Sequence, residues 1–244
     1  MSRDLNQYEQ EYAAIPFEDT MVKARRRVVL EFIGKHGFRD IMEVGCGGWP
    51  LFDALDDFRS FVLVEPGPVF FEKARAAARV HKGRDRIQIC QRRFEEFDGN
   101  ALVDCIVISS LLHEVNDPAA ILQQAFRIAP KGCWLHVNVP NAKSFHRLLA
   151  VESGLIKTEY ERSATQVRMQ QNHTFDLETL SRLVRASGFS VIESASYFIK
   201  PFTHAQMQQL VNLGMLTENL ISGLMKMERH APGLGAEIFV NARK

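Results

Sequence analysis

The sequence predicts an α/β fold in which a parallel β-sheet is covered by helices on both faces. Short apolar runs alternate with helical patterns of ten or more residues along most of the 244-residue chain, as in repeated βαβ units. A glycine-rich loop, residues 45–48, directly follows the first apolar run. Apolar residues make up 46% of the chain, so we expect a substantial core beneath this sheet.

The elements follow one another in a regular order after a polar segment, residues 1–19, which we expect to form an N-terminal arm. Apolar positions recur at helical spacing from 20 to 36, and Gly37 ends that helix. The expected strands are residues 41–44, 61–64, 86–90, 104–109, 133–139, 190–197 and 236–242. The expected helices between them are residues 51–58, 68–80, 118–128 and 176–187.

Two stretches interrupt this alternation, residues 141–172 and residues 200–233. Both contain apolar residues at helical spacing. The first leaves the carboxyl end of the fifth expected strand, where open α/β sheets bind ligands, so we expect it to cover a pocket. The second is rich in methionine, which is typical of ordinary core, of a pliant ligand pocket or of a homodimer contact.

Composition and charge exclude several classes of protein. The 30 basic and 29 acidic residues give a net charge of +1, which argues against a nucleic-acid-binding surface, and the basic run at 23–27 is expected to be solvated. No signal peptide and no apolar run of membrane-spanning length is visible, so we expect a cytoplasmic protein. The cysteines form no CxxC pair and are expected to be buried free thiols: Cys46, Cys90, Cys105 and Cys133.

The glycine loop and an acidic residue downstream predict a nucleoside-like ligand. Glycines at 45, 47 and 48 let the backbone turn sharply and approach a ligand closely. Pro50 stands where a dinucleotide fingerprint has its third glycine, so that fingerprint fails. Glu65 ends the second expected strand, 20 residues after Gly45, where a carboxylate can accept hydrogen bonds from both ribose hydroxyls. The loop leaves room for an adenosyl group with a short amino-acid tail.

Residues 40–140 resemble the class I, Rossmann-like methyltransferases that depend on S-adenosylmethionine (SAM). The matching segments are residues 41–47, 64–66, 93–95 and 111–118, the last of which often reads L-E-H-x-x-D-P in the family and has His113 and Glu114 in reverse order here. Residues 140–147 resemble a branch that includes ubiquinone-type and polysaccharide-associated enzymes. The resemblance implies a seven-stranded sheet of order 3-2-1-4-5-7-6 with the last strand antiparallel, and we expect residues 1–244 to form one domain.

The resemblance also implies SAM as the cofactor and a set of residues that bind it. These are Glu43, Gly45, Cys46, Gly47, Glu65, Pro66, Arg93, Phe94, Glu95 and Ser109. Within the set, the glycine loop would line the methionine tail, Glu65 would hold the ribose, and residues 93–95 would lie along the adenine. No metal is expected, because the ends of the fourth and fifth strands carry Ser109, Ser110 and Asn138 instead of clustered carboxylates.

Three histidines near the expected pocket are candidates for a catalytic base. Methylation of an alcohol requires a group that takes up the hydroxyl proton, and the pKa of histidine, about 6.5, suits that role. The candidates are His113 after the fourth strand, His146 after the fifth, and His173 before a helix. Each also has a structural interpretation: His113 could close a turn, and His173 could anchor the helix that follows it.

The acceptor and the activity each allow several hypotheses. Lys143, Arg147 and Lys200 could bind a carboxylate or phosphate on the acceptor, or simply be solvated. The leading hypothesis is O-methylation of a small acceptor such as a sugar or glycan intermediate. N-methylation of a small amine, which needs less help from a base, comes next. Two further hypotheses are a SAM-binding regulatory protein without catalysis and a nicotinamide oxidoreductase, and Pro50 weakens the second of these.

Overall fold

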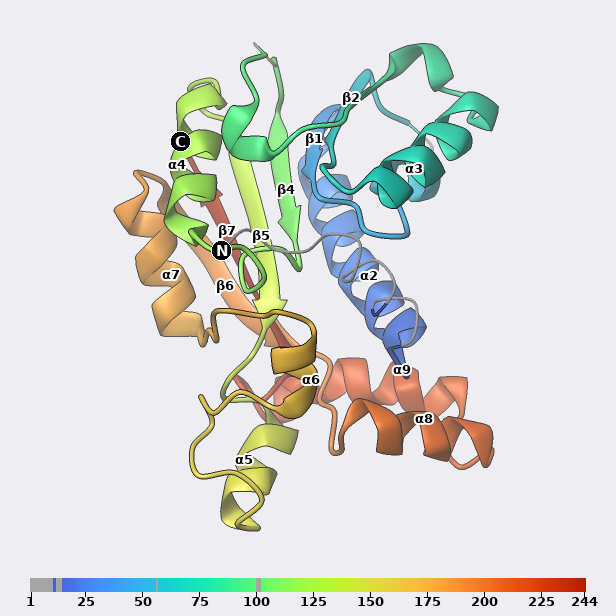
Figure 1. The fold of residues 1–244 in the computed structure, drawn as a ribbon, viewed down its shortest axis with the longest axis vertical. Coiled ribbons are helices and arrows are strands. Elements are labelled where there is room, and N and C mark those ends of the chain that lie inside the picture. Colours follow the sequence, from blue (N-terminus) through green and yellow to red (C-terminus); the bar gives the residue numbers. More distant parts are fainter. Residues whose placement is uncertain (1–10, 12–14, 56, 100–101) are drawn as a thin grey trace.

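A computed structural model of the chain describes residues 11, 15–55, 57–99 and 102–244, and in it one seven-stranded sheet organises the molecule (Figure 1). The strand order is β3-β2-β1-β4-β5-β7-β6, as predicted. Strands β1 to β5 pair in parallel, and β7 runs antiparallel to both of its neighbours. The strands are β1 (Asp40–Val44), β2 (Ser60–Val64), β3 (Ile87–Cys90), β4 (Cys105–Ser109), β5 (Trp134–Pro140), β6 (Ser190–Tyr197) and β7 (Glu237–Arg243). Most of the expected N-terminal arm, residues 1–10 and 12–14, lies outside the described residues.

Helices cover both faces of the sheet because neighbouring residues of each strand point to opposite sides. Helices α4 (Pro118–Ile128) and α7 (Leu177–Ala186) pack on one face, where Met42 and Ile106 point. Helices α2 (Glu18–His36) and α3 (Pro68–Val80) pack on the other face, where Ile41 and Cys105 point. The two faces therefore hold separate apolar cores. The loops that follow the strands lie at the carboxyl ends of the sheet, between these two helical layers.

The local sequence explains where these helices begin. The side chain of Asp117 accepts a hydrogen bond from the backbone of Ala120, and Pro118 occupies the first helical position of α4. Asp176 and Thr179 cap α7 reciprocally, each side chain accepting from the other's backbone N–H. These caps fix the start of each helix next to the carboxyl end of the sheet.

The expected helix over residues 51–58 is wrong, because only a short 3-10 turn, Leu51–Ala54, forms there. The chain becomes extended at Leu55. Residues six apart in an α-helix point in directions about 120° apart, since each residue turns the helix by about 100°. Leaving the helix allows both Phe52 and Phe58 to pack against Phe61, with ring centroids 5.5 and 5.7 Å apart.

The two inserts lie together beyond the carboxyl end of β5 (Figure 1). The first contains α5 (Phe145–Glu152) and α6 (Ala164–Arg168), and the second contains α8 (His204–Asn212), α9 (Glu218–Lys226) and a 3-10 turn, Met227–His230. Met207 is fully buried in a small core shared with Phe17 and Met21 beside the start of α2, whereas Met215 is exposed. Part of the methionine-rich pattern is therefore ordinary core.

The cysteines are free thiols with different degrees of burial. Cys105 and Cys133 are buried as expected, while Cys46 and Cys90 are only half-buried because both lie at strand ends beside loops. None of the helices in the described part of the chain is long and apolar enough to cross a membrane.

Candidate functional site

A cavity of about 240 Å³ lies at the carboxyl ends of β1, β2 and β4. These strands are neighbours in the sheet, so the loops that follow them meet at one edge. All the residues predicted to bind the cofactor line this cavity: Glu43, Gly45, Cys46, Gly47, Glu65, Pro66, Arg93, Phe94, Glu95 and Ser109. The structure thus brings together the residues that the sequence motifs singled out.

The glycine loop and Glu65 hold each other in place. The Cys46 and Gly67 amides donate hydrogen bonds of 2.9 and 2.7 Å to the two carboxylate oxygens of Glu65. Gly45 and Gly47 have φ values of 74° and 55°, a left-handed conformation that glycine adopts without strain. Each Glu65 oxygen has a second lone pair for a further donor, so the site fits the ribose of the expected cofactor. Burial raises the pKa of Glu65, and the backbone hydrogen bonds oppose that shift.

Glu43 forms the floor of the cavity next to the loop. Its carboxyl accepts a 2.9 Å hydrogen bond from the backbone N–H of Leu51, which ties β1 to the turn that follows the loop. Burial raises the pKa of Glu43 to about 8, against the hydrogen bond from Leu51 and the nearby positive charge of Arg26.

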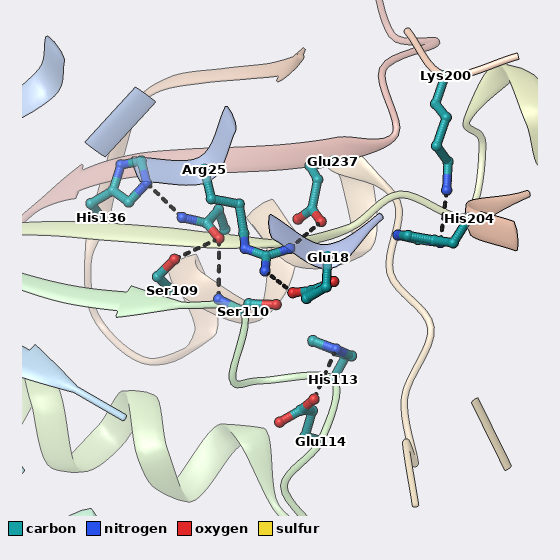
Figure 2. A network of polar contacts seen from close by, with 11 residues as sticks. Glu18, Arg25, Ser109, Ser110, His113, Glu114, His136, Lys200, His204 and Glu237 are labelled. Carbon is teal, nitrogen blue, oxygen red and sulfur yellow. Dashed lines mark hydrogen bonds and ion pairs between the residues drawn. The ribbon is translucent and has the colours of Figure 1, made fainter. Parts of the chain in front are cut away.

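Two arginines of α2 also line the cavity, and the expectation that the whole run at 23–27 is solvated is wrong for them. Arg26 donates hydrogen bonds of 2.9 and 3.2 Å to the carbonyl oxygens of Trp49 and Pro50. Arg25 is buried and bonds to Glu18 and to Glu237, the latter at 3.0 Å (Figure 2). The signal was present in the sequence: Arg25 lies four residues after Met21, on the buried side of the helix.

The end of β4 is held by hydrogen bonds from β5. The Ser109 hydroxyl and the Ser110 backbone N–H donate bonds of 3.0 and 3.1 Å to Oδ1 of Asn138 (Figure 2). Ser110 has φ 55°, a conformation that costs about 1–3 kcal/mol for a residue with a side chain. Asn138, which is fully buried, holds this strained turn at the wall of the cavity.

The hydrogen bonds continue from Asn138 across the sheet. Because the Asn138 oxygen accepts the serine donors, its Nδ2 donates to Nε2 of His136 at 3.0 Å. His136 Nδ1 then carries the proton and donates to Oδ1 of Asn241 at 2.7 Å. Asn241 Nδ2 donates in turn to Glu193 at 3.1 Å. Burial lowers the pKa of His136 to about 4, in agreement with this neutral form.

His113 and Glu114 form a buried pair at the end of the cavity nearest the first insert. His113 Nε2 lies 3.5 Å from Oε1 of Glu114 (Figure 2). Glu114 lines the cavity, whereas His113 lies behind it. The His113 carbonyl accepts backbone N–H bonds from Asn172 and His173 at 2.9 and 3.2 Å, which attaches the insert to this turn. Glu114 was not predicted as a site residue, although it belongs to the motif that contains His113.

The other two candidate histidines lie away from the cavity. His173 donates from Nε2 to the carbonyl of Asn116 at 3.1 Å and stacks on Phe175. His146 lies in the first turn of α5, and its buried Nδ1 has no hydrogen-bond partner among the described residues. The structure therefore does not bring His113, His146 and His173 to one point.

Of the three predicted acceptor-binding cations, Lys143 is separated from Arg147 and Lys200, which act on each other electrostatically. Lys143 is exposed and forms a 2.8 Å ion pair with Asp176. Arg147 donates to the backbone carbonyls of Glu159 and Glu161 and to the side chain of Gln166. Lys200 is 1% exposed, and its Nζ lies 3.0 Å from Nδ1 of His204 (Figure 2).

Comparison with known proteins adds independent findings. A family model described as a methyltransferase domain matches residues 18–194. No curated protein matches the chain significantly. At 11–16% identity, the solved structures below establish likeness of fold alone.

Three solved structures illustrate that likeness. The N-methyltransferase NodS from Bradyrhizobium japonicum WM9, in complex with S-adenosyl-L-homocysteine, has a TM-score of 0.55 at 11% identity, covering 91% of this chain and 86% of its own. A SAM-dependent methyltransferase from Mesorhizobium loti has a TM-score of 0.55 at 16% identity, covering 85% and 91%. StiE O-MT residues 961–1257 have a TM-score of 0.55 at 14% identity, covering 91% and 73%.

Proposed function

We propose that this protein methylates a hydroxyl group of a small acceptor. The chain belongs to the methyltransferase domain family and is a SAM-dependent methyltransferase. The observation that carries the choice of a hydroxyl is the buried pair of His113 and Glu114 at the end of the cofactor cavity. An alcohol must lose its proton as it is methylated, and a buried imidazole beside a carboxylate can take it up.

The cofactor is held by the wall of the cavity in this proposal. Bound SAM supplies an activated methyl group on a sulfonium, so the protein mainly aligns the two reactants and excludes water. Glu65 accepts from the ribose hydroxyls, Phe94 packs on the adenine, and the loop at residues 45–47 encloses the methionine tail. Arg26 provides a cation on the same wall for the methionine carboxylate.

The base acts through both members of the pair. Glu114 faces the cavity and takes up the acceptor proton at Oε1, and His113 Nε2 lies 3.5 Å from that atom to share it. Both side chains are about 95% buried, so water does not compete for this proton. Glu114 is accordingly the base that contacts the acceptor, and His113 supports it by sharing the proton. We assign His173 to anchoring the first insert through its bond to Asn116.

The inserts at 141–172 and 200–233 cover the acceptor side, and residues 1–244 act as one domain in this proposal. Two backbone hydrogen bonds from Asn172 and His173 to the His113 carbonyl support the role of the first insert. The core that joins Met207 to Met21 supports the role of the second. The acceptor is thus enclosed by segments outside the cofactor motifs.

The proposal is tested with His113→Asn and Glu114→Gln variants and paired acceptors that carry either a hydroxyl or an amine. Release of S-adenosyl-L-homocysteine measures turnover. We expect wild type to methylate the hydroxyl acceptors. The kcat of this reaction should be about 10²–10⁴-fold lower in both variants, because general base catalysis contributes about that much. Calorimetry is expected to give unchanged SAM affinity, since neither side chain is assigned to the cofactor.

The control is His36→Asn, a change at the exposed end of α2 far from the cavity. The same substitution at His146 and at His173 tests the two other histidines. Full turnover in both His113→Asn and Glu114→Gln would contradict the proposed base. Methylation of the amines alone would replace O-methylation by N-methylation.

A further inference from the structure

Beyond the cofactor cavity, a second set of basic side chains lies where the two inserts meet, with Lys200 buried and His146 and His204 half-buried. Lys200 follows β6 and extends to His204 at the start of α8 (Figure 2). An ammonium group only donates hydrogen bonds, so a charged Lys200 donates to Nδ1 of His204, whose proton is then on Nε2. Among the described residues, no carboxylate lies within 4 Å of the Lys200 nitrogen. Lys200 is therefore a buried cation without a counterion at contact distance.

The first insert brings a second, half-buried cation close enough to act on Lys200. Arg147 of α5 bonds to two backbone carbonyls and one amide, and within the described chain it has no carboxylate at ion-pair distance. Its neighbour His146 interacts electrostatically with Lys200, His204 and Arg147. The Nδ1 of His146 is buried and has no partner in the part of the chain that the structure describes.

The acidic groups of this region are bonded to Arg25, although Oε2 of Glu237 has no hydrogen-bond partner among the described residues. Glu18 and Glu237 act on Lys200 from beyond contact distance, and both are bonded to Arg25. A buried charge without a close partner is costly, because water no longer solvates it. Burial accordingly lowers the pKa of Lys200 to about 7, and those of His146 and His204 well below their usual value. Lys200 thus has only carboxylates that are shared with Arg25 near it, and none at contact distance among the described residues.

We propose that Lys200, His204 and His146 bind an anionic group of the acceptor, a carboxylate or a phosphate, so that the substrate is an acidic hydroxylated small molecule. This inference rests on the proposed function, because it names the class of acceptor. Lys200 contributes the charge, and the two imidazoles contribute hydrogen bonds around it.

The position of this set relative to the cofactor supports an acceptor that reaches both. Arg25 lines the cofactor cavity and bonds to Glu237 at 3.0 Å, and Glu237 in turn acts on Lys200. Glu237 thus lies between the cavity wall at Arg25 and Lys200. Lys143, which the sequence placed with Lys200, is paired with Asp176 and takes no part.

The site itself is tested with inorganic phosphate and acetate as probes, titrated into the full chain loaded with S-adenosyl-L-homocysteine. Calorimetry is expected to detect binding of at least one anion, weakened more than about tenfold in Lys200→Met, because a buried charge partner is lost. Lys143→Met, the same change at an exposed lysine, keeps wild-type affinity. Absence of binding, or equal binding by Lys200→Met and wild type, overturns the site.

A second measurement does not depend on the variant. Anion binding raises the pKa of Lys200, so near pH 8 the protein takes up a proton when the anion binds. The groups that interact with Lys200 besides the ligand are Glu18, Glu237, Arg147, His146 and His204, and Arg25 acts on His204. The binding enthalpy of wild type should therefore vary with the ionisation heat of the buffer, and affinity should fall from pH 7 to 9. Binding without proton uptake and without this pH dependence overturns the assignment to Lys200.

Paired acceptors then connect the site to the reaction. Hydroxy acids and their methyl esters are compared by release of S-adenosyl-L-homocysteine, and we expect the acids to have the lower KM, with Lys200→Met removing that difference. Preference for the esters contradicts the acidic acceptor. One combination of results separates the two proposals. If phosphate binding depends on Lys200 but no member of the panel is methylated, the anion site is supported and O-methylation of such acceptors is contradicted.

Discussion

At the scale of single residues, Glu65 joins the end of β2 to the cofactor loop. Its two oxygens accept the backbone N–H groups of Cys46 and Gly67, and the same oxygens face the cavity. Glu65 therefore has two roles: it fixes the cofactor loop, and it offers lone pairs to a ligand. The carboxylate is suited to this because it only accepts hydrogen bonds.

We predict that Glu65→Gln weakens SAM binding by about 10–100-fold, since a hydrogen bond to a charged group is worth about 1.5–3 kcal/mol. The amide nitrogen of glutamine would also face one of the two loop N–H groups, donor against donor. Calorimetry with SAM measures the effect. Glu72→Gln is the matched control, an exposed glutamate on α3 that does not line the cavity. Equal affinities of Glu65→Gln and this control would exclude Glu65 from the ribose site.

At the scale of elements, the pocket wall at the end of β4 depends on the next strand. Ser110 donates its backbone N–H to the carbonyl oxygen of Asn138, at 2.9 Å, and to its side-chain oxygen. Both bonds oppose the relaxation of a residue with positive φ. The register of β4 on β5, which places Ser109 opposite Asn138, makes these contacts available.

We predict that Asn138→Ala lowers the free energy of unfolding by about 2–4 kcal/mol, because it opens a cavity and leaves buried donors and acceptors unpaired. Denaturation in urea measures this loss. SAM affinity should fall as well, since Ser109 and Ser110 line the cavity. Asn212→Ala, at the exposed end of α8, is expected to change neither quantity. A stability loss no larger than that of the control would disprove the role of Asn138.

The elements also explain what could be predicted from the sequence. The strand order and most of the cofactor wall were predictable through the resemblance to a known family. The glycine loop and Glu65 were also predictable from the residues themselves, because each ends one strand of a βα unit. The turn at Leu51–Ala54 was not, because aromatic packing across the chain overrode helical periodicity. Grouping Lys143 with Lys200 failed because these residues are far apart in sequence and their distance depends on how the two inserts pack.

At the scale of the whole molecule, the two halves of the site have different origins. The cofactor wall comes mostly from residues 43–121, a nearly continuous segment. In the proposed function, the acceptor side combines the start of α2 with the two inserts. A small core around Met207 joins the second insert to α2, and backbone hydrogen bonds to the His113 carbonyl attach the first insert. The cofactor half can therefore be identified from one sequence, while the acceptor half requires the assembled fold.

The polar chain through His136 links four strands of the sheet, from β4 to β6, and makes stability depend on pH. His136 is fully buried, and burial lowers its pKa from 6.5 to about 4. Between these values the unfolded chain binds a proton that the folded protein does not. We predict that this residue contributes up to about 3 kcal/mol of stability near neutral pH that is lost as the pH falls from 6.5 to 4.

This prediction is tested by comparing wild type with a variant of His136. A comparison is needed because the pKa of Glu43 is raised, whereas that of His136 is lowered, and the two shifts affect stability in opposite directions. The raised pKa of Glu43 makes the folded protein more stable as the pH falls from 8 to 4.5. The free energy of unfolding in urea is therefore measured at several pH values between 7 and 4.5 for wild type and for His136→Gln. The glutamine amide does not titrate, and it can replace the hydrogen bonds of the imidazole to Asn138 and Asn241. The variant should lose less stability on acidification than wild type, whereas His36→Gln, at the exposed end of α2, should follow wild type. Parallel curves for His136→Gln and wild type would mean that the buried imidazole does not cause the acid sensitivity.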